Sequence, residues 1–143
     1  MNNMNLSGMR SLFAYTIPFG ATGSIAANGG VGASSFVVQA DSSFLWMASF
    51  AMCNLASPNN AILSVNQFVP VASVLVQDTQ SGMQLMNAPV PVASVFGIGE
   101  EVVRLAMPRL FPAKTQVSVT VTNADTANPI FLWLTFIGVK VFN

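Results

Sequence analysis

The segment IFLWLTFIGVKVF, residues 130–142, constrains the fold more than any other part of this chain. Its β-branched and aromatic residues favour a β-strand, and successive side chains of a strand point to opposite faces of its sheet. Both faces are apolar: one carries Phe131, Trp133, Ile137, Val139 and Val141, and the other Ile130, Leu132, Leu134, Phe136 and Phe142. A strand with one face in water should alternate apolar and polar residues. Something must therefore cover the second face of this strand.

The composition indicates that this cover is other protein. Apolar residues make up 52% of the chain and charged residues only 7%, whereas soluble domains typically have about 25% charged residues. Five basic residues balance five acidic ones, and a surface of near-zero net charge tends to associate. We therefore expect a protein whose surface is covered by partner chains.

Membranes and nucleic acids are poor candidates for that partner. No apolar run reaches the roughly eighteen residues of a membrane-spanning helix. The segment FLWMASFAM, residues 44–52, is followed by Asn54 and the turn signal SPNN. The few basic residues are spread along the chain and do not form the basic patch that binds phosphates. We expect neither a membrane nor a nucleic acid as partner.

Residues 36–143 read as one domain of short strands separated by turns. This pattern predicts an all-β fold, an antiparallel β-sandwich or jelly roll. The clearest strand is TQVSVTVTN, residues 115–123, and with residues 130–142 it is predicted to form a terminal hairpin. In DTQSG, residues 78–82, Gly82 is predicted to take the positive φ of a hairpin turn. Further strands are expected at 42–54, 61–69 and 90–97.

Residues 1–35 are predicted to be an extended N-terminal arm that ends in a glycine-rich loop. The stretch 20–35 has five glycines and mostly small residues, which suit a flexible segment better than a core. Residues 11–19, SLFAYTIPF, fit either a first strand or part of the arm. We expect the arm to cross onto a neighbouring chain, with Phe13 and Tyr15 at the contact.

Few side chains in this sequence can do chemistry, so we expect no enzyme activity, no cofactor and no metal. The chain has no histidine and a single cysteine, which removes the commonest general base and a thiolate metal site. Cys53 fits a small buried apolar residue. Asp78 and Asp125 lie in turns, where aspartate bonds to the local backbone. Glu100 and Glu101 are expected to pair with Arg104 or Arg109, or else to be solvated.

The remaining candidates are contact residues. PRLFPAK, residues 108–114, is predicted to be a rigid loop that docks on another protein. Core packing does not explain a second apolar face on residues 130–142, and a large exposed apolar patch marks an interaction site. The predicted protein-interface residues are Phe13, Tyr15, Arg109, Phe111, Phe131, Trp133 and Ile137.

Residues 70–143 resemble small virion proteins of tailed bacteriophages. The resemblance rests on a hairpin around DTQSG, a strand ending in Phe-Gly, the PRLFP corner, the VTVTN strand and a last strand closing with GVKVF. It implies a jelly-roll cement or decoration protein, a non-catalytic minor capsid protein. Such a protein would be made in the bacterial cytoplasm and bind the outside of the phage head. The implied partners are the major capsid protein and further copies of this chain, as a dimer or trimer.

Two alternatives remain open. The chain could instead be a structural protein of the tail or of a head-fibre base, which the sequence separates poorly from a cement protein. It could also be a module that binds glycans or a host surface, since jelly rolls often do so. Trp46 and Trp133 lie in the middle of predicted strands and not in loops, which disfavours sugar stacking.

Overall fold

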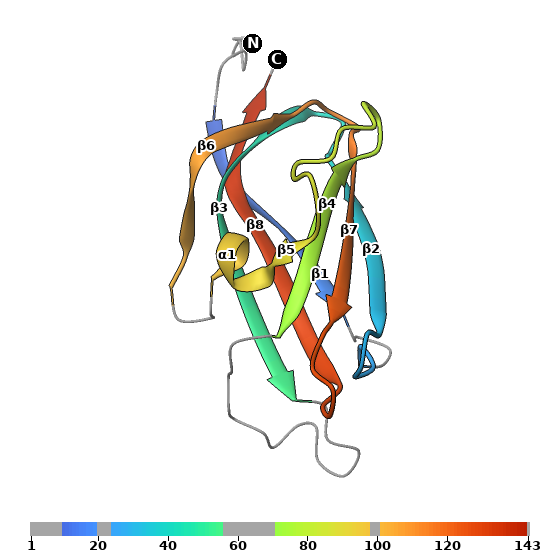
Figure 1. Cartoon of the computed structure of the whole chain (residues 1–143). Helices are drawn as coiled ribbons and strands as arrows, with labels where there is room; N and C mark the ends of the chain where they lie inside the picture. The colour runs from blue at the N-terminus through green and yellow to red at the C-terminus, as the bar shows by residue number, and fades with distance from the viewer. Residues whose placement is uncertain (1–9, 20–23, 56–70, 98–100, 143) are drawn as a thin grey trace, which may run out of the picture.

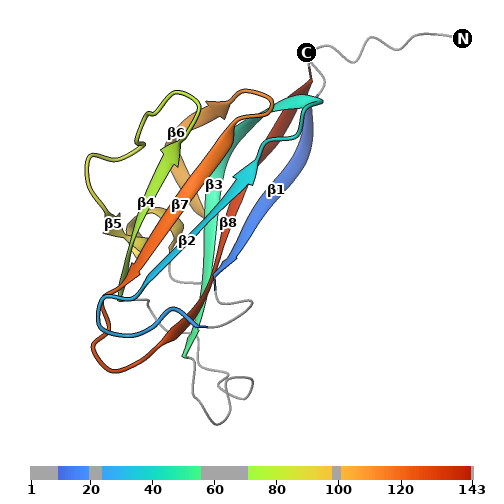
Figure 2. The same cartoon turned by 90° about the vertical axis from the view of Figure 1, so that its right-hand side faces the viewer.

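Two antiparallel sheets make up the fold (Figure 1). The computed structural model describes residues 10–19, 24–55, 71–97 and 101–142. Its elements are β1 (Arg10–Phe19), β2 (Val31–Val37), β3 (Ser42–Leu55), β4 (Ala72–Asp78), β5 (Val90–Pro91), α1 (Val92–Phe96), β6 (Val103–Phe111), β7 (Gln116–Asn123) and β8 (Ile130–Phe142). Sheet A has the order β1-β8-β3-β6, and sheet B has the order β2-β7-β4-β5. Figure 2 shows sheet B in front of sheet A.

The strand pairing identifies a jelly roll. The first strand pairs with the last, β1 with β8, and the series continues inward as β2 with β7, β3 with β6 and β4 with β5. A long antiparallel hairpin that rolls up into two facing sheets produces this order. The predicted all-β sandwich is therefore confirmed, and the topology is that of a jelly roll.

The core lies between the inner faces of the sheets. The even-numbered residues from Ile130 to Phe136 on β8 and the odd-numbered valines of β7 are fully buried, as the alternation of a strand requires. Trp46 and Phe96 pack on Phe136 at ring-centroid distances of 4.8 and 5.2 Å. The Trp46 Nε1 donates hydrogen bonds to the Ala48 carbonyl and the Ser49 hydroxyl at 2.9 and 3.1 Å. The indole is thus buried without an unsatisfied donor.

The predicted arm is wrong over residues 10–19 and 24–35, which belong to the sandwich. β1 pairs with β8 along its whole length, from Arg10 opposite Val141 to Phe19 opposite Leu132. Strand pairing uses backbone groups, so a glycine-rich sequence can join a sheet. Its small residues fit where bulky residues of neighbouring segments lie against them. A Cβ on Gly32 would lie 2.9 Å from the Phe19 ring, so the missing side chain makes room for the core. Residues 1–9 and 20–23 lie outside the described residues.

Two other predictions about connections also need correction. β7 and β8 were expected to form a hairpin, but they lie in different sheets, and the turn between them crosses the sandwich. Residues 90–97 were expected to be a strand, but only Val90–Pro91 is one, and α1 follows. Val92 and Phe96, four residues apart on α1, are both buried, because this spacing places them on one helix face.

The turn over residues 78–82 is confirmed in part. Gly82 has a φ of 69°, and the Asp78 carboxylate accepts hydrogen bonds from the backbone N–H groups of Gln80 and Ser81. Directly after the turn, the hairpin pairing is limited to an isolated bridge between Gln77 and Gln84. The strand predicted at 61–69 lies outside the described residues.

Candidate interaction surface

The outer face of sheet A is the main candidate site. Odd-numbered residues of β8 point away from sheet B, and the strand registers identify the side chains beside them. We call this set the apolar outer face: Leu12, Ala14, Thr16 and Pro18 from β1; Phe131, Trp133, Thr135, Ile137 and Val139 from β8; Leu45, Met47, Ala48, Phe50 and Met52 from β3; Val102, Arg104 and Leu110 from or next to β6.

Several of these side chains are more exposed than apolar residues of a folded domain usually are. Leu12 is 81% exposed, Leu110 56%, Val102 52% and Met47 41%. Phe131, Trp133 and Ile137 are half-buried by their neighbours on the same face. A contiguous apolar surface of this kind marks an interaction site more often than free surface.

The outer face of sheet B differs in chemistry. On its central strand β7, the outward residues Gln116, Ser118, Thr120 and Thr122 are all polar, while the valines between them are buried. This is the alternation expected of a sheet with one face in water. The central strand β7 of sheet B is therefore suited to solvent, whereas the apolar outer face of sheet A is suited to contact.

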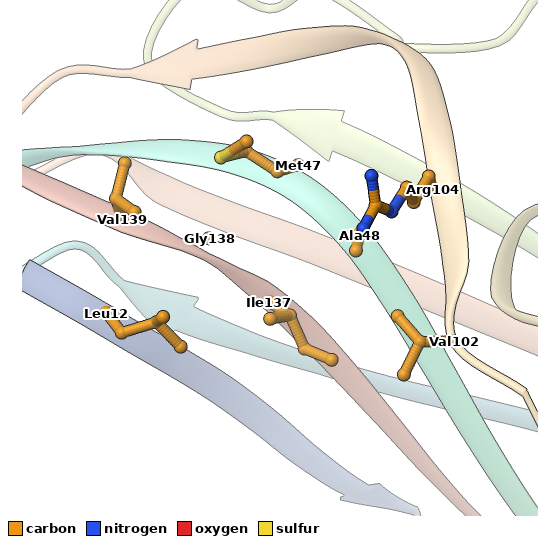
Figure 3. A pocket seen from close by; sticks show the side chains of 8 residues that line it. All are labelled: Leu12, Met47, Ala48, Val102, Arg104, Ile137, Gly138 and Val139. Carbon is orange, nitrogen blue, oxygen red and sulfur yellow. The ribbon is translucent and has the colours of Figure 1, made fainter.

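A shallow hollow of about 400 Å³ lies in the apolar outer face (Figure 3). Leu12, Met47, Ile137, Val139 and Val102 surround it, from or beside all four strands of sheet A. Ala48 keeps its floor low because its side chain is small, and the backbone of Gly138 also lines the hollow. The floor also contains the bulge of β3 between Trp46 and Ala48. The Arg104 guanidinium lies at the edge of the hollow beside Ala48 (Figure 3).

Lys140 is the charged residue of β8, and its side chain points away from the apolar outer face. Its ammonium makes an ion pair with Asp41 at 3.3 Å, donates to Gln39 and lies 4.5 Å from the centre of the Phe13 ring. The hydrogen bond from Ser42 and the nearby Lys140 hold the pKa of Asp41 below its ordinary value. The charge of Lys140 is thus neutralised at the end of the sandwich and is absent from the apolar outer face.

Three of the seven predicted interface residues lie together on this face: Phe131, Trp133 and Ile137. Phe111 does not, and its prediction as a surface residue is wrong. It is 1% exposed and packs beside Trp46 at 6.3 Å between ring centroids. Residues 108–111 belong to β6 and not to a docking loop. Alternation along β6 turns Phe111 inward and Leu110 outward.

Phe13, Tyr15 and Arg109 lie apart from this face. Tyr15 stacks on Phe36 of β2 with 4.5 Å between centroids, and its hydroxyl accepts a hydrogen bond from the Gln39 N–H. Phe13 packs edge-on against Tyr15. Arg109 is exposed beside Leu85 and Met86, on the α1 side of β6. Within this chain the two aromatics close the gap between β1 and β2.

Sequence reasoning missed Leu12, Met47, Val102 and Leu110 on the apolar outer face. Each stands beside other apolar residues in its segment, so the sequence does not single it out, and single exposed hydrophobic residues are ordinary. Only the strand order β1-β8-β3-β6 brings them next to the odd-numbered residues of β8. The one available signal was the two-faced pattern of residues 130–142.

Two of the acidic side chains that the structure describes, Asp78 and Asp125, serve local turns. The Asp125 carboxylate accepts hydrogen bonds from the N–H groups of Ala127 and Asn128 at 2.9 and 3.0 Å, which lower its pKa. Burial alone would raise the pKa of Asp78, but hydrogen bonds from Ser81 and Gln80 lower it overall. The predicted turn roles of both residues are confirmed. The described part of the chain contains no group of three or more potential metal ligands and no helix able to span a bilayer.

Cys53 should be inert toward thiol reagents in the folded protein. It is 3% exposed, and burial raises the pKa of its thiol to about 12, so the reactive thiolate is scarce at neutral pH. We expect negligible labelling by a maleimide in native buffer and complete labelling in denaturant, measured by intact mass. Rapid labelling of the native chain would contradict the burial of β3 at this position.

Comparisons with known proteins leave the family open. No family model matches the chain, and no curated protein matches it. Among solved structures, the infectious bursal disease virus VP2 subviral particle has a TM-score of 0.41 at 9% identity. The match covers 95% of this chain and 33% of that one. The Drosophila NLP core has a TM-score of 0.32 at 11% identity, covering 93% of this chain and 99% of that one. Similarities this distant carry no information on function, so the jelly-roll assignment rests on the strand pairing alone.

Proposed function

We propose that this chain is a structural protein of a virion, and specifically a cement protein that binds a bacteriophage head and bridges major capsid subunits. The observation that carries the proposal is the apolar outer face of sheet A. It combines strongly exposed residues such as Leu12 and Leu110 with the half-buried Phe131 and Trp133. The resemblance of residues 70–143 to phage virion proteins supports the same role.

The energetics of such contacts suit a cement. An interface of standard size buries about 1,600 Å², and at about 25 cal/mol per Å² its gross hydrophobic term is about 40 kcal/mol. Lost rotational freedom and side-chain ordering offset most of that term. A net gain of a few kcal/mol per copy, repeated over a shell, would resist internal pressure.

The alternative structural role, at the tail or at a head-fibre base, shares this surface and differs in copy number. Quantitative mass spectrometry of purified virions separates the two roles. A cement protein should be present at a simple fraction of the number of major capsid subunits. A vertex or tail protein should be present at only a few copies per particle.

A glycan-binding role is less well supported. Trp46 is 3% exposed and lies in the core, where it cannot stack on a sugar. Trp133 lies in the middle of a sheet face with apolar neighbours, and sugars would also require polar partners around the ring. A glycan array on the purified chain tests this role directly.

Trp133→Asp should reduce the occupancy of this chain on virions by about tenfold or more, because a tryptophan at the centre of an interface commonly contributes over 2 kcal/mol. Occupancy is measured by mass spectrometry of virions assembled with each variant, and circular dichroism checks folding. The matched control is Thr120→Asp, which places the same charge on the outer face of sheet B. Equal occupancy of wild type and Trp133→Asp would rule out this face as the binding surface.

A further inference from the structure

The two sides of the sandwich differ in how their strand edges are protected. An edge strand presents unpaired N–H and C=O groups to any other chain, and short strands, prolines and charges discourage such pairing. On the β5 and β6 side all of these are present: β5 has two residues and contains Pro91, and β6 contains Pro108, Arg104 and Arg109. Figure 1 shows α1 on this side as well.

The edge at β2 has none of these protections. β2 is seven residues long, VGASSFV, without proline or charge. The chain has no charged residue at all from residue 11 through residue 40. Val31 and Val37, at the two ends of β2, are 64% and 55% exposed. Among the described residues, β7 is the strand that pairs with β2, and no described strand pairs with its other edge.

Hydrogen bonds at the ends of β2 identify which of its backbone groups point away from β7. The Val38 N–H donates to the Thr115 carbonyl at 2.8 Å, and the Gly30 carbonyl accepts from the Asn123 N–H at 2.8 Å. Backbone groups in an antiparallel ladder alternate in direction. Even-numbered residues of β2 therefore face β7, while Val31, Ala33, Ser35 and Val37 direct their N–H and C=O groups away from the sheet.

We propose that β2 pairs antiparallel with β2 of a second copy, about a twofold axis that passes at Ser34. An antiparallel edge can complement itself about such an axis. This register sets Val31 opposite Val37 of the partner subunit and Ala33 opposite Ser35 of the partner subunit. Every outward backbone group then meets another, and two β-branched side chains face each other. No like charges oppose one another, because β2 has none.

The β2 dimer would affect how the chain bridges capsid subunits. This step of the inference rests on the proposed function. The axis of an antiparallel pair is perpendicular to its sheet, so sheet B would continue from one copy into the other. Both copies would then present their apolar outer faces on the same side of the dimer. Two binding faces on one rigid body give avidity without any new contact, which suits a protein that bridges neighbouring subunits.

Disulfide trapping tests the register in the full-length chain. The Cα atoms of a non-hydrogen-bonded antiparallel pair lie about 4.5 Å apart, which is within disulfide range of about 4.4–6.8 Å. Ser34→Cys should form a covalent dimer under mild oxidation in native buffer. Cys53 will not interfere, because it is 3% exposed. The matched control Ala106→Cys puts an exposed thiol on the protected edge strand β6, and its dimer yield should be at least tenfold lower.

Sedimentation velocity gives an independent measurement. The wild-type chain should sediment as a dimer. Ala33→Pro should sediment as a folded monomer, because proline removes an N–H group that would donate to the partner strand and that the β2–β7 ladder does not use. A monomeric wild-type chain, or equal cross-linking of Ser34→Cys and Ala106→Cys, would overturn the pairing. Virion occupancy is measured separately. A monomeric chain that still occupies virions would overturn only the β2 pairing. A dimeric chain that is absent from virions would overturn only the proposed function.

Discussion

Gly138→Val should leave the chain unfolded at room temperature, and Gly138→Ala should lower the free energy of unfolding by about 3 kcal/mol or more. A Cβ at this position would overlap the Leu45 carbonyl oxygen and lie 3.0 Å from the Phe44 ring. Leu45 is a backbone neighbour in the adjacent strand β3, so β3 and β8 would have to separate in the middle of sheet A. Overpacking against backbone cannot be relieved by a change of rotamer.

Gly82→Ala is the matched control for this prediction. A Cβ on Gly82 meets nothing within 4 Å, but its φ of 69° is left-handed, so the substitution costs about 1 kcal/mol through backbone strain alone. Urea unfolding followed by circular dichroism measures both variants. A Gly138→Ala chain as stable as the control would mean that β3 and β8 do not approach as closely as described.

Phe136→Ala should lower the free energy of unfolding by about 3–5 kcal/mol. Phe136 is fully buried and meets Phe36, Trp46 and Phe96 at ring-centroid distances of 5.0, 4.8 and 5.2 Å. Removal of its ring would leave a cavity where the two sheets and α1 meet. Because folded domains are stable by only about 5–15 kcal/mol, this loss is a large share of the total.

Phe131→Ala makes the same chemical change on the same strand but on the apolar outer face. Its ring is half-buried, with Trp133 at 6.4 Å between centroids. We expect a loss of about 1 kcal/mol or less in the isolated chain, since little cavity forms at a surface. The difference between the two variants measures which face of β8 is core. Similar losses for both would contradict the assignment of inner and outer faces.

The positions of the strands could be predicted from the sequence more readily than the way in which the strands pair. Alternating valines at 117, 119 and 121 and the two-faced pattern of residues 130–142 report local environment, and both strands form where expected. Pairing depends on contacts between distant segments, which no local pattern encodes. Adjacent strands joined by a short turn suggest a hairpin, yet the turn at Asp125 carries the chain from one sheet to the other.

The N-terminal region shows the same limit for the candidate surface. Small residues such as Gly32 predict a flexible segment, because they cannot form a core alone. In the structure, Gly32 packs against Phe19 and Ile25. Phe13 and Tyr15 are predicted as contact residues because the sequence predicts an arm over their segment. Once β1 joins the sheet, alternation turns these aromatics inward and leaves Leu12 outside. Assigning the contact face therefore required the register of β1 on β8.

The position of β8 between β1 and β3 affects when the protein can fold during synthesis. Sheet A has no continuous ladder until the C-terminal strand is present, because β1 and β3 both pair with β8 and not with each other (Figure 1). The nascent chain thus carries two apolar strands, β1 and β3, without their shared partner until β8 has left the ribosome. Folds dominated by such distant pairings are slow to form and prone to aggregate meanwhile. Emergence of β8 from the ribosome, and protection by chaperones until then, should therefore determine the yield of native protein.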